Sequence, residues 1–158
     1  QHMPAGFTFS LSRRLNEISE VEVKEAQEGD ILKNGVVYIA PGGKHMRVVK
    51  KGTDYCIKLS DEPAIDGLRP CANVMYESLE NCQYDEITCV VLTGMGADGT
   101  KGIQGLAAHH KKLHVIAQDA DTCVVYGMPK AIAQTGLVDE VVPLGSVAET
   151  ITKNVGVS

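Results

Sequence analysis

One segment of the sequence leads from an apolar run directly into a glycine-punctuated turn that carries a carboxylate. It reads Val90-Val91-Leu92-Thr93-Gly94-Met95-Gly96-Ala97-Asp98-Gly99. Open α/β sheets bind their ligands outside the carboxyl ends of the strands, which is where such a turn lies. Glycines let the backbone approach a ligand and direct N–H groups toward it, and Asp98 could orient a catalytic histidine. These residue types in this order favour acyl-transfer chemistry.

The same turn is open to two other interpretations on the residues alone. A structural turn, in which Asp98 is the N-cap of the helix that follows, fits the pattern as well as a catalytic turn does. A nucleotide-binding domain with residues 94–99 as a phosphate cradle is disfavoured. The turn is not Gly-x-Gly-x-x-Gly, and it lacks the Lys-Ser/Thr ending of a phosphate loop.

The histidines offer one further candidate for chemistry. His2 stands at the N-terminus before Met3 and Pro4, where a lone histidine is usually exposed to solvent. The others are His45, His109, His110 and His114. They include no pair four residues apart with a glutamate between, so a metalloprotease-type zinc site is not expected. The pair at 109–110, beside two lysines, fits a solvated helix end.

Composition indicates one globular domain. The chain has 158 residues, of which 44% are hydrophobic and 22% charged, as is typical of soluble domains. No apolar run approaches the roughly 20 residues that span a bilayer, and nothing in the sequence reads as an anchor or a secretion signal, so neither is expected. The net charge is −5 and the basic residues are scattered, which disfavours nucleic acid as a partner.

The cysteines favour a reducing, cytoplasmic setting over a disulfide framework. They are Cys56, Cys71, Cys82, Cys89 and Cys123. Their number is odd and no Cys-x-x-Cys pair occurs, so neither a zinc ribbon nor a redox motif is indicated. Each is expected to be a small buried hydrophobe, although Cys123 stands close to a glycine and deserves separate consideration as a thiol.

Periodicity and turn residues predict an α/β fold. An amphipathic helix is expected over residues 7–18, with Phe7, Leu11, Leu15 and Ile18 on its apolar face. Short strands are expected at 21–26 and 35–40, and a hairpin is expected from 47–50 and 55–59. The second half alternates between strands and helices. The expected elements are a helix near 74–82, strands at 87–93, 113–117 and 140–142, and helices at 100–110, 129–134 and 147–153.

This alternation is typical of βαβ units. We therefore expect a mainly parallel, Rossmann-like, three-layer sheet with helices on both faces and an antiparallel hairpin addition.

Four ordered segments resemble those of the chemotaxis protein-glutamate methylesterases. They are Gln1-His2-Met3-Pro4-Ala5-Gly6-Phe7-Thr8, Tyr38-Ile39-Ala40-Pro41-Gly42-Gly43-Lys44-His45-Met46, Leu92-Thr93-Gly94-Met95-Gly96-Ala97-Asp98-Gly99, and Ala117-Gln118-Asp119 through Cys123-Val124-Val125-Tyr126-Gly127-Met128-Pro129. The resemblance extends over essentially the whole chain. Four motifs in the correct order are far more specific than any one of them.

The resemblance implies a cytoplasmic hydrolase that removes methyl groups from glutamates of chemoreceptors and, in many members, deamidates glutamines. It implies a Ser-His-Asp triad in which His2 is the base and Asp98 its orienting acid. The N–H of Met95, flanked by Gly94 and Gly96, is implied as the donor of the oxyanion and substrate-binding turn. No metal or organic cofactor is implied.

The chain departs from the family because the glycine-rich turn with the nucleophilic serine is not among its residues. Ser10 and Ser12 fall inside the predicted helix 7–18 and are expected to be ordinary surface or packing residues. We expect the catalytic domain over residues 1–158 to be N-terminally incomplete, with the serine and a receiver domain upstream in the parent protein. The alternative is an inactive binding module of the same fold. Cys71 stands where the family usually has serine, as a simple isostere.

Overall fold

The computed structural model describes residues 1–109 and 112–156. The chain divides into two compact units, Gln1–Cys82 and Gln83–Ser158. Each unit has its own strands, helices and buried side chains. The single domain predicted over residues 1–158 stays a prediction. Within the part of the chain that is described, no helix has both the length and the apolar character needed to cross a membrane.

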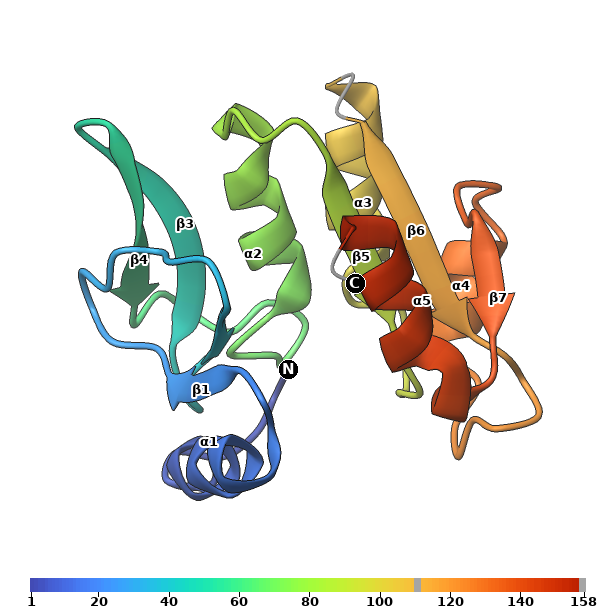
Figure 1. The fold of residues 1–158 in the computed structure, drawn as a ribbon, viewed down its shortest axis with the longest axis horizontal. Helices are drawn as coiled ribbons and strands as arrows, with labels where there is room; N and C mark the ends of the chain where they lie inside the picture. Colours follow the sequence, from blue (N-terminus) through green and yellow to red (C-terminus); the bar gives the residue numbers. More distant parts are fainter. Residues whose placement is uncertain (110–111, 157–158) are drawn as a thin grey trace. The chain divides into compact units, whose positions relative to one another are not determined.

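The first unit combines helices with two small sheets (Figure 1). Its elements are α1 (Phe7–Ile18), β1 (Glu22–Glu25), β2 (Val36–Ile39), β3 (His45–Lys51), β4 (Asp54–Ser60), α2 (Ala72–Ser78) and the 3₁₀ helix η1 (Leu79–Asn81). Strands β1 and β2 are parallel, whereas β3 and β4 are antiparallel. The second pairing confirms the predicted hairpin. Gly52, at φ 63°, supplies the left-handed backbone that its tight turn requires.

Helix α1 begins and ends where the sequence predicts, but the face that it buries is different. Phe7 and Ile18 expose 65% and 63% of their surface, whereas Thr8 and Ser12 are buried. The Thr8 hydroxyl donates to Glu25 Oε1 at 2.5 Å and accepts from the Gly42 N–H at 2.9 Å. These bonds turn the small polar side of the helix inward, so the ends of the predicted apolar stripe stay in solvent.

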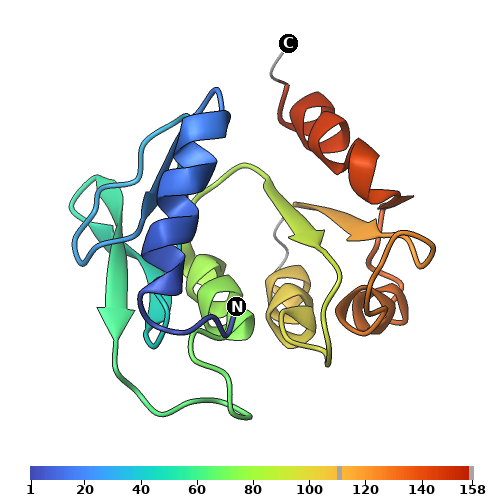
Figure 2. The same ribbon diagram turned by 90° about the horizontal axis from the view of Figure 1, so that it is seen from below.

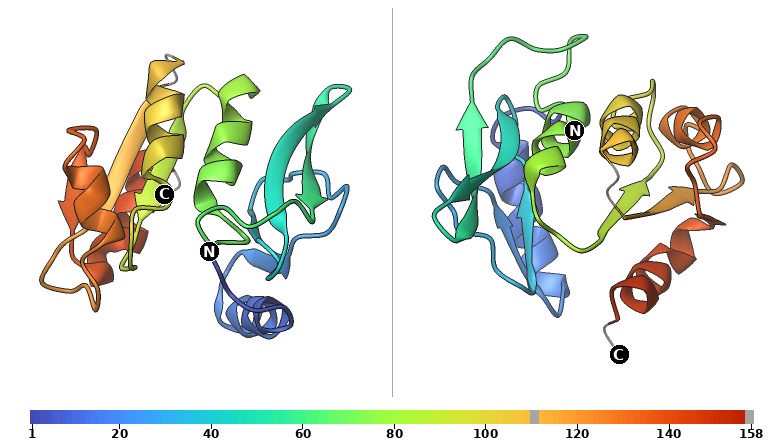
Figure 3. Two further views of the ribbon diagram at one scale, coloured as in Figure 1. Left: turned by 180° about the vertical axis from the view of Figure 1, so that it is seen from behind. Right: turned by 90° about the horizontal axis from the view of Figure 1, so that it is seen from above.

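The core of the first unit includes residues of the β3–β4 hairpin and the residue that follows η1. Its centre consists of Ala26, Val48, Ile57 and Cys82. Figure 3 shows α2 lying beside β3. A hydrogen bond joins these two elements, because Ser78 Oγ accepts from the Val48 N–H at 2.9 Å.

The second unit is a parallel sheet with helices on both faces. Its elements are β5 (Ile87–Val91), α3 (Thr100–Ala108), β6 (Leu113–Gln118), α4 (Met128–Ala133), β7 (Glu140–Val142), the 3₁₀ helix η2 (Leu144–Ser146) and α5 (Val147–Val155). The strand order is β5-β6-β7, and both pairings are parallel. Figure 2 shows α3 and α4 on one face of this sheet and α5 on the other. The α/β class, the three layers and the added hairpin are thus confirmed.

The ends of several elements differ from the predicted ones. Strand β5 stops at Val91 rather than at residue 93, because Thr93 and Gly94 bond to the 125–128 segment instead of to a strand. Helix α3 ends at Ala108, and residue 110, the predicted end, lies outside the described residues. Helix α5 continues to Val155, where Gly156 at φ 72° supplies a left-handed cap.

The five cysteines are reduced thiols, and four of them are buried as expected. Burial raises the pKa of the Cys89 thiol to about 12, because a thiolate in the apolar sheet loses its hydration. Cys123 is partly exposed.

We therefore predict that a thiol-specific reagent at pH 8 modifies Cys123 in the native chain, and modifies the other four cysteines only after unfolding. The number of thiols that react, counted by absorbance, checks this.

A Cys123→Ser variant is the control for that measurement. In the native variant no thiol should react, and four should react after unfolding. A thiol that still reacts in the native variant would contradict the assignment.

Candidate active site

The glycine-punctuated turn lies where the sequence predicts, after the carboxyl end of β5 in the second unit. Gly94 forms an isolated parallel bridge with Tyr126, and Met95 exposes 83% of its surface. Asp98, four residues after Gly94, exposes only 6%. The second unit therefore brings four of the predicted site residues, Gly94, Met95, Gly96 and Asp98, into one turn, in which Met95 is exposed and Asp98 is buried.

The buried carboxylate is not the N-cap of the following helix. Helix α3 begins at Thr100, and its N-cap is Gly99, with no side-chain capping bond. Asp98 Oδ1 instead accepts from the N–H of Gly99 at 2.9 Å. Gly99 has φ 91°, a left-handed conformation that favours glycine. The N-cap residue of α3 is thus Gly99 and not Asp98, as the structural alternative expected, while Asp98 bonds within the turn.

The backbone of the turn passes very close to the segment that precedes α4. A Cβ at Gly127 would lie 2.6 Å from Gly94 O and 3.0 Å from Gly96 N, and a Cβ at Gly94 would lie 2.5 Å from Met128 Sδ. A Cβ does not come within 3 Å of another non-bonded heavy atom, so a side chain at either position would require movement. The obstacle at Gly127 is backbone, whereas at Gly94 it is the flexible Met128 side chain. Hydrogen bonds join the same two segments, since the Met128 N–H donates to Gly94 O at 2.8 Å.

A second set of hydrogen bonds joins the turn to Val125, and it involves Thr93, the residue before Gly94. The Thr93 hydroxyl accepts from the Val125 N–H at 2.9 Å and donates to Val125 O at 3.1 Å, and the Gly94 N–H donates to the same carbonyl at 3.1 Å. Sequence reasoning missed this role of Thr93, because a threonine after an apolar strand is common. The signal that could have found it is that the 92–99 and 117–129 motifs both carry glycines at the positions of contact.

His2 lies in the first unit, within a segment held by backbone contacts. Its side chain is exposed, its φ is 53°, and its N–H donates to Pro70 O at 3.1 Å. A Cβ at Gly42 would lie 2.3 Å from Pro4 O, so this short segment rests directly on the 41–43 loop. A left-handed φ is costly for a histidine and persists only where surrounding contacts impose it. The first unit thus presents the imidazole to solvent from a fixed backbone.

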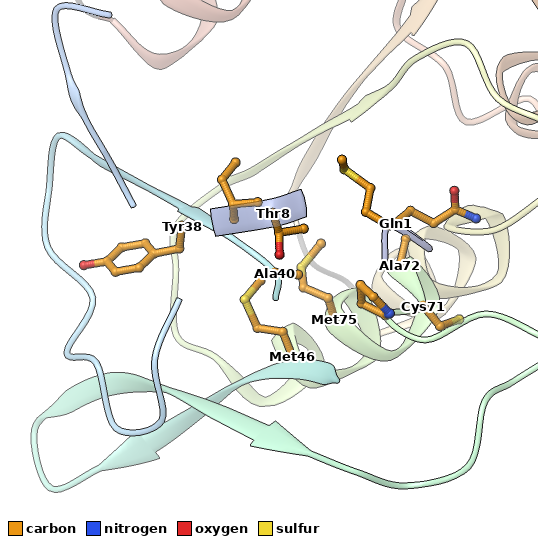
Figure 4. Close-up of a pocket in the computed structure, with 11 residues that line it drawn as sticks. Gln1, Thr8, Tyr38, Ala40, Met46, Cys71, Ala72 and Met75 are labelled. Carbon is orange, nitrogen blue, oxygen red and sulfur yellow. The ribbon is translucent and has the colours of Figure 1, made fainter. Parts of the chain in front are cut away.

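An apolar cavity of about 250 Å³ lies beside this segment in the first unit (Figure 4). The residues on either side of His2, Gln1 and Met3, line it, together with Met46, Met75 and Cys71. Thioether side chains adapt readily to the shape of whatever occupies such a space.

The serines in α1 behave as ordinary helix residues. Ser12 is buried and its hydroxyl donates to Phe9 O at 2.8 Å, one turn earlier. Ser10 is exposed. Neither stands in a strand-to-helix turn that would present an oxygen to a substrate.

Comparison with known proteins gives one consistent result. Residues 1–151 match the family model described as CheB methylesterase. The protein-glutamate methylesterase/protein-glutamine glutaminase of Desulfotalea psychrophila is 45% identical over 157 residues, which are 98% of this chain and 43% of that protein. The protein of the same name from Oceanobacillus iheyensis is 47% identical over 154 residues, which are 97% and 44% of the two.

A solved structure agrees with these relatives. The crystal structure of the Thermotoga maritima CheB methylesterase catalytic domain matches with a TM-score of 0.90 and 38% identity, over 97% of this chain and 80% of that one. The chain spans less than half the length of the two curated relatives.

The close approach at Gly127 can be tested by adding one methyl group. We predict that Gly127→Ala lowers the free energy of unfolding by about 1–3 kcal/mol, as overpacking of a tight contact does. Gly145 is the matched control in the same unit, because a Cβ there has no atom within 4 Å. Gly145→Ala should stay within about 0.5 kcal/mol of the parent in urea denaturation. Equal stabilities for the two variants would contradict the contact.

Proposed function

The chain belongs to the CheB methylesterase family, and from this membership we propose that the whole protein hydrolyses glutamate methyl esters on chemotaxis receptors. The observation that supports it best is the turn after β5, where the buried Asp98 and the exposed Met95 stand within one family motif. Two relatives of this chain are named protein-glutamate methylesterase/protein-glutamine glutaminase. Deamidation of receptor glutamines is the second reaction that we propose.

The proposed mechanism assigns one role to each of three residues. A serine outside these 158 residues attacks the ester carbonyl, and His2 accepts the serine proton and delivers it to the departing methanol. Asp98 holds the His2 ring in the tautomer whose free nitrogen faces the serine. The Met95 N–H donates to the oxygen that becomes negative in the tetrahedral intermediate. Water then hydrolyses the acyl-enzyme, with His2 again as base. The amide reaction differs only in releasing ammonia.

The glycines of the turn have a defined part in this proposal. Gly94 and Gly96 flank the oxyanion donor, and Gly96 has φ 85°, which a side chain would strain. Because the residues before and after Met95 have no side chains of their own, they add little bulk beside the Met95 N–H when a substrate carbonyl approaches it. We assign these two positions to substrate binding.

The partners and setting follow from the same proposal. Methyl-accepting chemotaxis receptors are the substrates, an upstream receiver domain in the same polypeptide is the regulatory partner, and the cytoplasm is the compartment. The competing proposal is a binding module of the same fold that hydrolyses nothing. It would be favoured if the whole protein bound receptor without releasing methanol.

The first test uses the whole protein and measures methanol release from methylated receptor. We predict that His2→Ala and Asp98→Asn each lower kcat by about 1,000-fold or more, because the base and its orientation are lost. His109→Ala, at the exposed end of α3, is the control and should keep the parent rate. Full activity in the His2 variant would rule the mechanism out.

A second test uses residues 1–158 alone. When the nucleophile is missing, the remaining base and oxyanion donor can accelerate ester hydrolysis only slightly. We predict no measurable acyl-enzyme and no methanol release above background. Turnover by this chain would show that the nucleophile lies within it.

A further inference from the structure

Gln118 is a fully buried polar side chain at the end of β6 that the mechanism above does not use. Its Oε1 accepts from the Thr93 N–H at 2.8 Å. Its Nε2 donates to Thr122 O at 2.8 Å and to Thr122 Oγ1 at 3.2 Å. A buried carboxamide is costly unless it is hydrogen-bonded. Here a main-chain donor faces one end and a main-chain acceptor the other, which fixes the orientation of the amide.

Gln118 bridges two loops that meet at the candidate site. Thr93 begins the glycine-punctuated turn, and Thr122 belongs to the loop between β6 and α4. That loop is itself ordered, because Asp119 Oδ1 accepts from both the N–H and the hydroxyl of Thr122 at 2.9 and 2.6 Å. Its far end returns to the turn through the bonds between Thr93 and Val125. The Gln118 carboxamide thus links Thr93, at the start of the turn, to Thr122 of the β6–α4 loop. Val125 of the same loop also bonds to Thr93.

We propose that Gln118 is a positioning residue for the oxyanion turn, an inference that rests on the proposed esterase function. Its Oε1 fixes the peptide N–H of Thr93, two residues before the Met95 N–H that would donate to the substrate oxygen. An oxyanion donor stabilises the transition state because it is already oriented before charge develops. Loss of the carboxamide leaves the donor in the chain but lets its direction vary.

The test replaces the carboxamide without changing the volume greatly. Gln118→Met in the whole protein removes both hydrogen-bonding ends. We expect kcat for methanol release to fall by about 10-fold, less than the roughly 100-fold or greater loss typical of removing an oxyanion donor outright. We expect KM to stay within about 2-fold, because the lost orientation acts on the transition state. A kcat within about 2-fold of the parent would overturn the proposal.

A control separates positioning from stability. Ile116 lies in the same strand, is equally buried and has an apolar side chain. Ile116→Val should lower the melting temperature and leave kcat unchanged. If Ile116→Val lowers kcat as much as Gln118→Met does, the effect is one of stability and the proposal fails.

Substitutions at the exposed Thr93 provide a second experiment, whose result does not depend on whether the Gln118 variant folds. Thr93→Val removes the hydroxyl that clasps Val125, whereas Thr93→Ser keeps it. We expect the valine variant to lose kcat and the serine variant to retain it within about 2-fold. Equal kcat values for the Thr93→Val and Thr93→Ser variants would contradict the proposal that these hydrogen bonds fix the conformation of the turn. A parent protein with no esterase activity would instead reject the proposed function itself.

Discussion

The backbone around Gly94 passes so close to Gly127 that no side chain fits between the two segments. A Cβ at Gly127 would lie 2.6 Å from Gly94 O, and the hydrogen bonds of Gly94 and Thr93 to the 125–128 segment depend on that closeness. The second unit therefore ends its β5 strand early and turns the chain toward α3 within a few residues. The buried Asp98 and the exposed Met95 both stand in this turn.

The first unit uses the same kind of contact at its own candidate residue. The chain at His2 rests on the 41–43 loop, where a Cβ at Gly42 would lie 2.3 Å from Pro4 O. The buried Thr8 hydroxyl bonds to the Gly42 N–H and joins this loop to α1. In both units, glycines allow main chain to meet main chain, and the functional residue follows or precedes the contact by a few positions. Close packing of backbone against backbone therefore contributes to the placement of both candidate segments.

Local signals in the sequence were sufficient for much of the fold. The apolar spacing in residues 7–18 located α1, and the run at 140–142 located β7. Which face of α1 is buried was not predictable from the sequence, because it depends on the hydrogen bond between Thr8 and Glu25, 17 residues away in the chain. For the site, the turn motif predicted Asp98, and the resemblance predicted Met95 and His2. The hydrogen bonds of Gln118 and Thr93 were not predicted, because they join residues that are 25 or more positions apart in the chain.

The central claim is that His2 and Asp98 act as one catalytic unit in the whole protein. A double-mutant cycle on kcat/KM for methanol release, with His2→Ala, Asp98→Ala and the double variant, tests it most directly. We predict that the double variant is no slower than the slower single variant, as in a triad whose members depend on one another. Losses that add in free energy would contradict it, because two independent residues would then each contribute without the other.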